Sequence, residues 1–240
     1  MERMAVVTGG TRGLGRAISL ALHEAGHRVA AVYHRDTEAA RQFSDETGIA
    51  SYQWSVTDFH ACHHGIAQVQ HDLGPVDILI NNAGVIEDAM LHRMTPEQWM
   101  KVIHTNLNSM FNMSRNVIEG MRERHFGRII NISSINGRKG QAGQSNYAAS
   151  KSGVLGFTKA LALESAAKNI TVNAIAPGYC DTDMLASLTP ETLHTIVAAI
   201  PAGRLGAPSD IGRVAAFLAS DDAGFINGAT FDVNGGQFMG

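Results

Sequence analysis

The chain has 240 residues, a formal net charge of −3, and contents of 45% hydrophobic and 17% charged residues. This composition excludes a disordered chain, and the small negative charge gives no reason to expect a nucleic acid or an anionic membrane as partner. The two cysteines are far apart in the sequence, which argues against a disulfide framework and fits a reducing compartment. Because there is neither a basic, apolar leader nor an apolar stretch of membrane-spanning length, we expect a cytoplasmic protein.

Short apolar runs alternate with longer segments of helical periodicity along the chain. Several runs are apolar at nearly every position, which is typical of parallel strands covered on both faces. The predicted strands are Met4–Thr8, Arg28–Tyr33, Ile49–Trp54, Asp77–Asn81, Arg128–Ser133, Thr171–Ala176 and Ala229–Val233. The predicted helices include Leu14–Ala25, Pro96–Met121 with Thr95 as its cap, Tyr147–Lys168 and Pro208–Ser220. With no linker or repeat to divide it, the chain 1–240 is predicted to be a single α/β domain, a doubly wound Rossmann-type sheet of about seven parallel strands with helices on both faces.

The first predicted strand runs directly into a glycine-rich turn, Thr8–Gly15, which opens the first helix. Glycines allow the backbone to turn tightly and to approach a pyrophosphate, which the helix N-terminus attracts. The spacing is Gly-x3-Gly-x-Gly, and such a turn can also serve strand–helix packing alone, but its position favours dinucleotide binding. The residues of the turn expected to bind the cofactor are Gly9, Thr11, Arg12, Gly13, Leu14 and Gly15.

The end of the second predicted strand bears on the choice of dinucleotide. An acid there would bind a ribose 2′-hydroxyl, whereas an arginine would accept a 2′-phosphate. The strand ends at Tyr33, and Arg12 and Arg35 are nearby in the sequence. Asp36 has roughly the spacing of a ribose-binding acid, but we expect it to cap the next helix instead. The prediction is therefore NADPH, with Tyr33 and Arg35 at its adenosine end.

Tyr147 and Lys151 are four residues apart at the start of a predicted helix, so they share one helix face. A tyrosine with an ordinary pKa of about 10 is a poor acid at neutral pH, and a nearby ammonium would lower that pKa. Ser134, at the end of the preceding strand, can donate a hydrogen bond to a substrate carbonyl. Such Tyr-x-x-x-Lys pairs also occur on exposed helices without any function. Only the combination with the glycine-rich turn indicates that this pair is catalytic.

Taken in chain order, these motifs resemble the short-chain dehydrogenase/reductase family. The resemblance rests on the glycine-rich turn, Asn81-Asn82-Ala83-Gly84, Asn106, Ser134, Tyr147-x-x-x-Lys151, Pro177-Gly178 and the terminal Val233–Gly236. It implies that Tyr147 protonates a carbonyl oxygen while hydride arrives from the nicotinamide, that Lys151 binds the nicotinamide ribose, that Ser134 holds the carbonyl, and that Asn106 anchors a proton-relaying water. It further places Val56, Asn82, Ala83, Gly84, Pro177, Gly178, Cys180 and Thr182 at the cofactor.

Within the family, the chain is most similar to acetoacetyl-CoA reductases and to 3-oxoacyl-[acyl-carrier-protein] reductases. The resemblance implies that Asp88, Gln141, Gln144 and Tyr179 contact the acyl group, together with Ser134 and Tyr147. The two glutamines can equally belong to a polar loop without this role. The expected reaction is the reduction of acetoacetyl-CoA to (R)-3-hydroxybutanoyl-CoA; the alternative is a carrier-bound 3-oxoacyl substrate of fatty-acid synthesis.

The sequence leaves alternatives for the role of its basic residues and for catalysis. Four basic residues either meet an acidic carrier or CoA phosphates or form solvated faces: Arg122, Arg124, Arg128 and Lys168. A remote alternative is a non-catalytic dinucleotide sensor, although such a protein could dispense with the Ser–Tyr–Lys set that is complete here. The resemblance implies a homotetramer.

Two segments lie outside these motifs. Residues 179–207 contain no predicted strand and a helix from Pro190 capped by Thr189; they are expected to be either a flap over the substrate or a surface excursion. The segment Phe59–His64 is dense in histidines, but it opens a helix away from the predicted chemistry, so we expect an exposed polar turn and no metal site.

Overall fold

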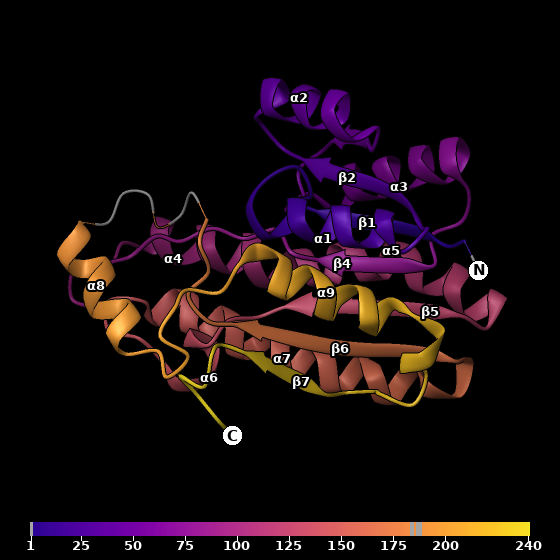
Figure 1. Ribbon diagram of the computed structural model, residues 1–240. Helices are drawn as coiled ribbons and strands as arrows, with labels where there is room; N and C mark the ends of the chain where they lie inside the picture. Colours follow the sequence, from indigo (N-terminus) through magenta and orange to yellow (C-terminus); the bar gives the residue numbers. More distant parts are fainter. Residues whose placement is uncertain (1, 183–184, 186–188) are drawn as a thin grey trace.

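The computed structural model describes residues 2–182, 185 and 189–240. It contains a parallel sheet in the order β3-β2-β1-β4-β5-β6-β7, seen from one face behind a layer of helices in Figure 1. The strands are β1 (Met4–Thr8), β2 (Arg28–Tyr33), β3 (Ala50–Gln53), β4 (Ile78–Asn81), β5 (Gly127–Ile132), β6 (Ile170–Pro177) and β7 (Thr230–Val233). The doubly wound α/β prediction is confirmed, and the order reverses between β1 and β4, where ligands of such sheets bind.

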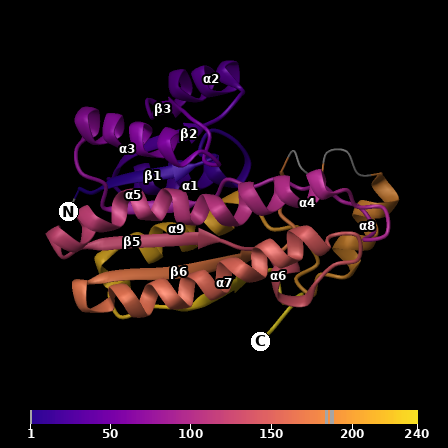
Figure 2. The same cartoon turned by 180° about the vertical axis from the view of Figure 1, so that it is seen from behind.

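Helices cover both faces of the sheet. Those of the described residues are α1 (Gly13–Glu24), α2 (Thr37–Thr47), α3 (Phe59–Leu73), α4 (Pro96–Ile103), α5 (Ser109–Arg124), α6 (Asn136–Lys139), α7 (Ser145–Ser165), α8 (Pro190–Ala198) and α9 (Pro208–Ala219). Helices α1 and α9 lie together on the face seen in Figure 1, and α3, α5 and α7 cover the face seen in Figure 2. None of the helices described is long and apolar enough to cross a membrane.

The two-sided burial explains why the strands lack polar alternation. In β1, Ala5 and Val7 pack into the cluster that contains residues of α1 and α9. Met4 and Val6 point the other way, into the cluster with residues of α3 and α5. Successive side chains of a strand point to opposite faces, so both sets must be apolar.

The predicted helix Pro96–Met121 is wrong in one respect, because it is interrupted. Thr95 and Gln98 form the expected capping box at its start, but residues His104–Asn108 adopt a π-helical turn between α4 and α5. Insertions of this kind in helices are frequent at functional sites. Here the turn contains Asn106, whose side chain is fully buried.

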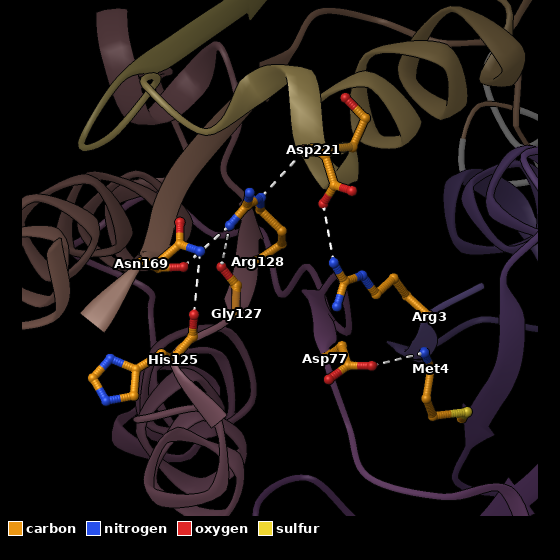
Figure 3. A network of polar contacts seen from close by, with 9 residues as sticks. Arg3, Met4, Asp77, His125, Gly127, Arg128, Asn169 and Asp221 are labelled. Atoms are coloured by element: carbon orange, nitrogen blue, oxygen red, sulfur yellow. Dashed lines mark hydrogen bonds and ion pairs between the residues drawn. The ribbon is translucent and has the colours of Figure 1, made fainter. Parts of the chain in front are cut away.

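Arg128, at the start of β5, is buried at the end of the sheet where the strands begin. Its guanidinium donates to the carbonyls of Ser220, Gly127 and Asn169 at 3.2, 2.9 and 3.3 Å, in the network drawn in Figure 3. It also stacks on Phe126. The prediction that Arg128 meets a carrier or lies on a solvated face is therefore wrong, because the side chain satisfies carbonyls inside the fold.

The two ends of the segment 179–207 are joined by backbone hydrogen bonds. Gly206 donates its N–H to the carbonyl of Tyr179 at 2.9 Å, and its own carbonyl accepts from Asp181 at 2.9 Å. Thr189 caps α8 as predicted. Residues 183, 184 and 186–188 lie outside the described part of the chain, and the assignment of this segment as a flap stays a prediction.

Candidate active site

The glycine-rich turn forms a backbone cradle between β1 and α1. Gly9 and Gly13 have φ angles of 63° and 53°, in the region that favours glycine. A Cβ on Gly15 would lie 1.9 Å from the carbonyl oxygen of Gly9, so the turn and the helix can approach this closely only without a side chain. Arg12 precedes α1 without capping it through its side chain. The first N–H groups of α1 are thus available to an anion, which fits a dinucleotide pyrophosphate.

Thr8 and Asn82 hold this cradle to the end of β4. The Thr8 hydroxyl accepts the N–H groups of Asn82 and Ala83 at 2.9 and 3.0 Å and donates to the carbonyl of Ile80 at 3.2 Å. The Asn82 amide donates to the carbonyls of Thr8 and Gly9 at 2.9 and 3.3 Å. Asn82 therefore shapes the turn through its side chain, and Thr8 is a supporting residue that the motif reading did not assign. A buried hydroxyl at the end of an apolar strand was the available signal.

At the adenosine end, Tyr33 closes β2 and no acid occupies the strand end. The carboxylate of Asp36 accepts the N–H of Ala39 at 3.0 Å and caps α2, as predicted. Arg12 and Arg35 are exposed and form no ion pair within the described residues. Val56 is buried, and its carbonyl already accepts the amide of Asn112 at 2.9 Å.

Ser134, Tyr147 and Lys151 meet at the ends of β5 and α7. Ser134 lies just beyond β5, and its hydroxyl acts on the pKa of the Tyr147 phenol. The Lys151 ammonium lies 5.8 Å from the centroid of the Tyr147 ring and donates to the carbonyl of Ile132 at 2.8 Å. Gly137 packs so closely on this helix that a Cβ there would lie 2.7 Å from the Lys151 backbone carbon. The three predicted groups therefore form one site on rigid elements.

Burial controls the proton affinities of this site. It raises the pKa of Tyr147, opposed by the hydrogen bond with Ser134 and reinforced by the charges of Asp88 and Tyr179. Burial also lowers the pKa of Lys151 from 10.5 to about 8. The expected lowering of the tyrosine pKa is wrong for the protein chain itself, because the ammonium points to Ile132 and desolvation dominates. A raised pKa keeps the phenol protonated, the form that can donate a proton.

Asn106 lies close to Lys151, on the other side of Gly84. Its Oδ1 accepts the N–H of Val85 at 2.8 Å, and its two amide hydrogens go to the carbonyl of Val85 and the hydroxyl of Ser150. Gly84 is close enough that a Cβ there would lie 3.4 Å from Asn106 Oδ1 and 3.6 Å from Lys151 Nζ. With both amide hydrogens in use, the water contact implied by the resemblance would fall to the main-chain carbonyl of Asn106.

The residues expected at the acyl group lie near Tyr147, with one exception. Gln144 donates to the Asp88 carboxylate at 2.8 Å, and Asp88 and Tyr179 both act on the pKa of Tyr147. Gln141 is exposed; its backbone carbonyl accepts the N–H of Gln144 at 3.1 Å, and its side chain makes no hydrogen bond within the described residues. Asp88, Gln144 and Tyr179 thus form a polar group near Tyr147.

The turn after β6 completes the cofactor side. A Cβ on Gly178 would lie 2.8 Å from the backbone of Asn234, so only glycine fits after Pro177. The Thr182 methyl group would be 4.0 Å from a Cβ on Gly13. Thr182, expected at the nicotinamide end of the cofactor, therefore lies near the glycine-rich turn. The Cys180 side chain packs in the core, so only its backbone is available to a cofactor.

The histidine-rich segment Phe59–His64 opens α3, as predicted. His60, His63 and His64 are exposed, while Cys62 faces the core. Within the residues that the structure describes, no three His, Cys, Asp or Glu side chains are arranged to hold a metal ion.

A glycine cradle at the switch point of a parallel sheet, next to a Ser–Tyr–Lys set, defines a dinucleotide-dependent oxidoreductase. A family model described as short chain dehydrogenase matches residues 3–193. The acetoacetyl-CoA reductases of Shinella zoogloeoides and Rhizobium meliloti are 59% and 58% identical over 240 residues, covering 100% of both chains. The 3-oxoacyl-[acyl-carrier-protein] reductase FabG of Haemophilus influenzae is 45% identical, covering 99% of this chain and 98% of its own. The chain belongs to the short-chain dehydrogenase family, and its cofactor is a nicotinamide dinucleotide.

Proposed function

We propose that the protein reduces a β-keto thioester to the 3-hydroxyacyl thioester with NADPH, acetoacetyl-CoA to (R)-3-hydroxybutanoyl-CoA in particular. The observation that carries this proposal is the polar group of Asp88, Gln144 and Tyr179 next to Tyr147. A substrate with a second carbonyl one methylene from its ketone needs such partners, whereas a simple ketone does not. The names of the two relatives at 59% and 58% identity support the same substrate.

In this reaction the nicotinamide supplies a hydride to the ketone carbon when the cofactor is bound. Tyr147 donates its phenolic proton to the ketone oxygen, which becomes the hydroxyl, and the thioester bond is untouched. Ser134 donates a hydrogen bond to the same oxygen as negative charge develops on it. Lys151, with a pKa of about 8, is largely protonated at neutral pH and supplies the proton that restores the phenol. Asn106 supports this supply behind Lys151, and segment 179–207 covers the substrate.

The preference for NADPH rests on the arrangement around β2. Asp36 is engaged as the cap of α2, whereas Arg12 and Arg35 are free to meet a 2′-phosphate. Replacing Arg35 with alanine should lower kcat/KM for NADPH by about tenfold, the loss of one charge-assisted contact, and leave that for NADH unchanged. An equal effect on both cofactors would contradict the preference.

The second candidate is reduction of a 3-oxoacyl group on acyl-carrier protein, which the 45% identical relative favours. Coenzyme A and the carrier present the same phosphopantetheine arm, so the reacting end does not separate them. The deciding experiment measures NADPH oxidation with acetoacetyl-CoA and with acetoacetyl-carrier protein at equal concentrations. A higher kcat/KM on the CoA thioester is expected, and a strong preference for the carrier would reverse the ranking.

We also propose a homotetramer. Apolar side chains are exposed on three of its long helices, with Phe111 on α5 55% exposed, Leu163 on α7 84% exposed and Phe217 on α9 46% exposed. Groups of exposed apolar residues are typical of surfaces that associate. Light scattering of the purified protein tests the assembly, and a monomer at micromolar concentration would contradict it.

A further inference from the structure

Asn136, the first residue of the short helix α6, has a side chain buried at 7% exposure. Its amide nitrogen donates to Gln144 Oε1 at 2.9 Å, and its backbone N–H donates to the Ser134 hydroxyl at 3.1 Å. Its amide oxygen has no hydrogen-bond partner within the described part of the chain. A buried oxygen without a partner is destabilising, so stability alone does not account for an asparagine at this position.

The direction of the hydrogen bonds around Asn136 is fixed from one end. An ionised Asp88 carboxylate can only accept, so Gln144 must turn its NH2 group toward Asp88. The Gln144 oxygen then points back and needs a donor, which is the Asn136 amide. One Gln144 hydrogen goes to Asp88, and the other remains for a carbonyl oxygen placed beside it.

The same residue leaves the Ser134 proton free. Because the backbone N–H of Asn136 donates to the Ser134 oxygen, the single hydroxyl hydrogen stays available, and it can be directed at the ketone oxygen when a substrate is bound. Helix α6 is held firmly against α7 in this position, since the Ser152 hydroxyl donates to the carbonyl of Gly137 at 2.5 Å. Supporting residues on such rigid elements can orient a site.

We propose that Asn136 is a positioning residue: by donating to Gln144 Oε1 it holds the orientation that Asp88 sets, in which the second hydrogen of the Gln144 NH2 group donates to the thioester carbonyl of the substrate. This assignment rests on the proposed function. Asn136 then has two roles. Its side chain orients Gln144, which binds the thioester carbonyl, and its backbone N–H orients the Ser134 hydroxyl, which binds the ketone. A side-chain substitution removes the first role and leaves the second.

The test is a double-mutant cycle of Asn136→Ala and Gln144→Ala, measured as steady-state reduction of acetoacetyl-CoA with saturating NADPH. Asn136→Ala should raise KM about tenfold, the loss of about one hydrogen bond, and leave kcat unchanged. Gln144→Ala should do the same, and the double variant should be no worse than Gln144→Ala alone. Asn116→Ala, in α5 and away from the site, is the control and should leave both constants unchanged.

Asn136→Asp has nearly the same volume and carries the test if the alanine variant does not fold. Its carboxylate would face Gln144 Oε1, so Gln144 would lie between two carboxylates and could not keep the orientation that Asp88 requires without an oxygen–oxygen repulsion. KM should therefore rise in the wild-type background but not beside Gln144→Ala. Additive effects of the two positions, or a fall in kcat with unchanged KM, would overturn the proposal. A wild-type protein that does not turn over acetoacetyl-CoA would instead overturn the proposed function.

Discussion

Replacing Lys151 with methionine should inactivate the protein and stabilise it. Lys151 is 3% exposed, and its ammonium makes no ion pair within the described residues and donates to the carbonyl of Ile132. Methionine has a similar length and no charge, so it removes a desolvated cation from the core. Replacing buried charges with apolar groups of similar volume is often stabilising.

The size of the effect follows from the pKa of Lys151. A fall from 10.5 to about 8 corresponds to about 3 kcal/mol lost on burying the charge, at about 1.4 kcal/mol for each unit. The carbonyl of Ile132 loses its donor in the variant, which costs about 1–2 kcal/mol. The net gain of about 1–2 kcal/mol raises Tm by about 2–8 °C in a domain of this size. Loss of the proton supply should lower kcat at least about 100-fold.

The pH dependence has a defined sign. Below pH 8 the folded and unfolded states are both charged at Lys151, and the full cost of burial is present. From about 8 to 10.5 the unfolded state binds more protons, so wild-type stability rises with pH relative to the variant. Calorimetry of the cofactor-free proteins should therefore show a Tm advantage of Lys151→Met at pH 7 that shrinks toward pH 10.5. The exposed Lys159 on the same helix is the matched control, and Lys159→Met should give no such trend. A Tm below that of the wild type at pH 7, or a gap independent of pH, would refute the reasoning.

Three further outcomes test other parts of the structure. Gly15→Ala should weaken NADPH binding at least about 100-fold, since its Cβ would lie 1.9 Å from the Gly9 carbonyl oxygen; an unchanged fluorescence titration would contradict the cradle. Arg128→Met should lower the free energy of unfolding, measured in urea, by about 3 kcal/mol, because three carbonyls lose a charged donor. The kcat should stay unchanged, because Arg128 lies at the end of the sheet opposite the site, and a loss of kcat in the folded variant would contradict this. Asp36→Ala should cost about 1 kcal/mol of stability as a lost helix cap and leave the NADPH-to-NADH ratio of kcat/KM unchanged; a selective loss of NADH activity would instead place Asp36 at the ribose.

The strands were predictable from the sequence to within one residue at each end. Their apolar runs reflect burial on two faces, as in β1, where alternate side chains enter opposite clusters. Helix starts were readable where a side chain caps them, at Thr95 and Asp36. Apolar runs and capping residues are local sequence signals, and tertiary contacts did not change the structure that they predict here.

The parts that the sequence missed depend on tertiary packing. Helical periodicity does not distinguish the π-helical turn around Asn106 from an ordinary α-helix. The pKa of Tyr147 is set by burial and by Asp88, which is distant in the sequence, and not by the lysine four residues away. Arg128 resembles a surface residue until the carbonyls of Gly127, Asn169 and Ser220 enclose it. Asn136 belongs to no motif, and only its hydrogen bonds reveal its position between Ser134 and Gln144.

In the reaction proposed for this protein, Tyr147 protonates the ketone of a β-keto thioester. The most direct measurement compares NADPH oxidation by the wild type and by Tyr147→Phe with acetoacetyl-CoA, alongside NADPH binding to both proteins. The phenylalanine keeps the ring and removes only the hydroxyl that Ser134 contacts. We expect kcat to fall at least about 1000-fold, within the range for a lost general acid, while the dissociation constant of NADPH is unchanged. Turnover by Tyr147→Phe at a rate near that of the wild type would contradict it.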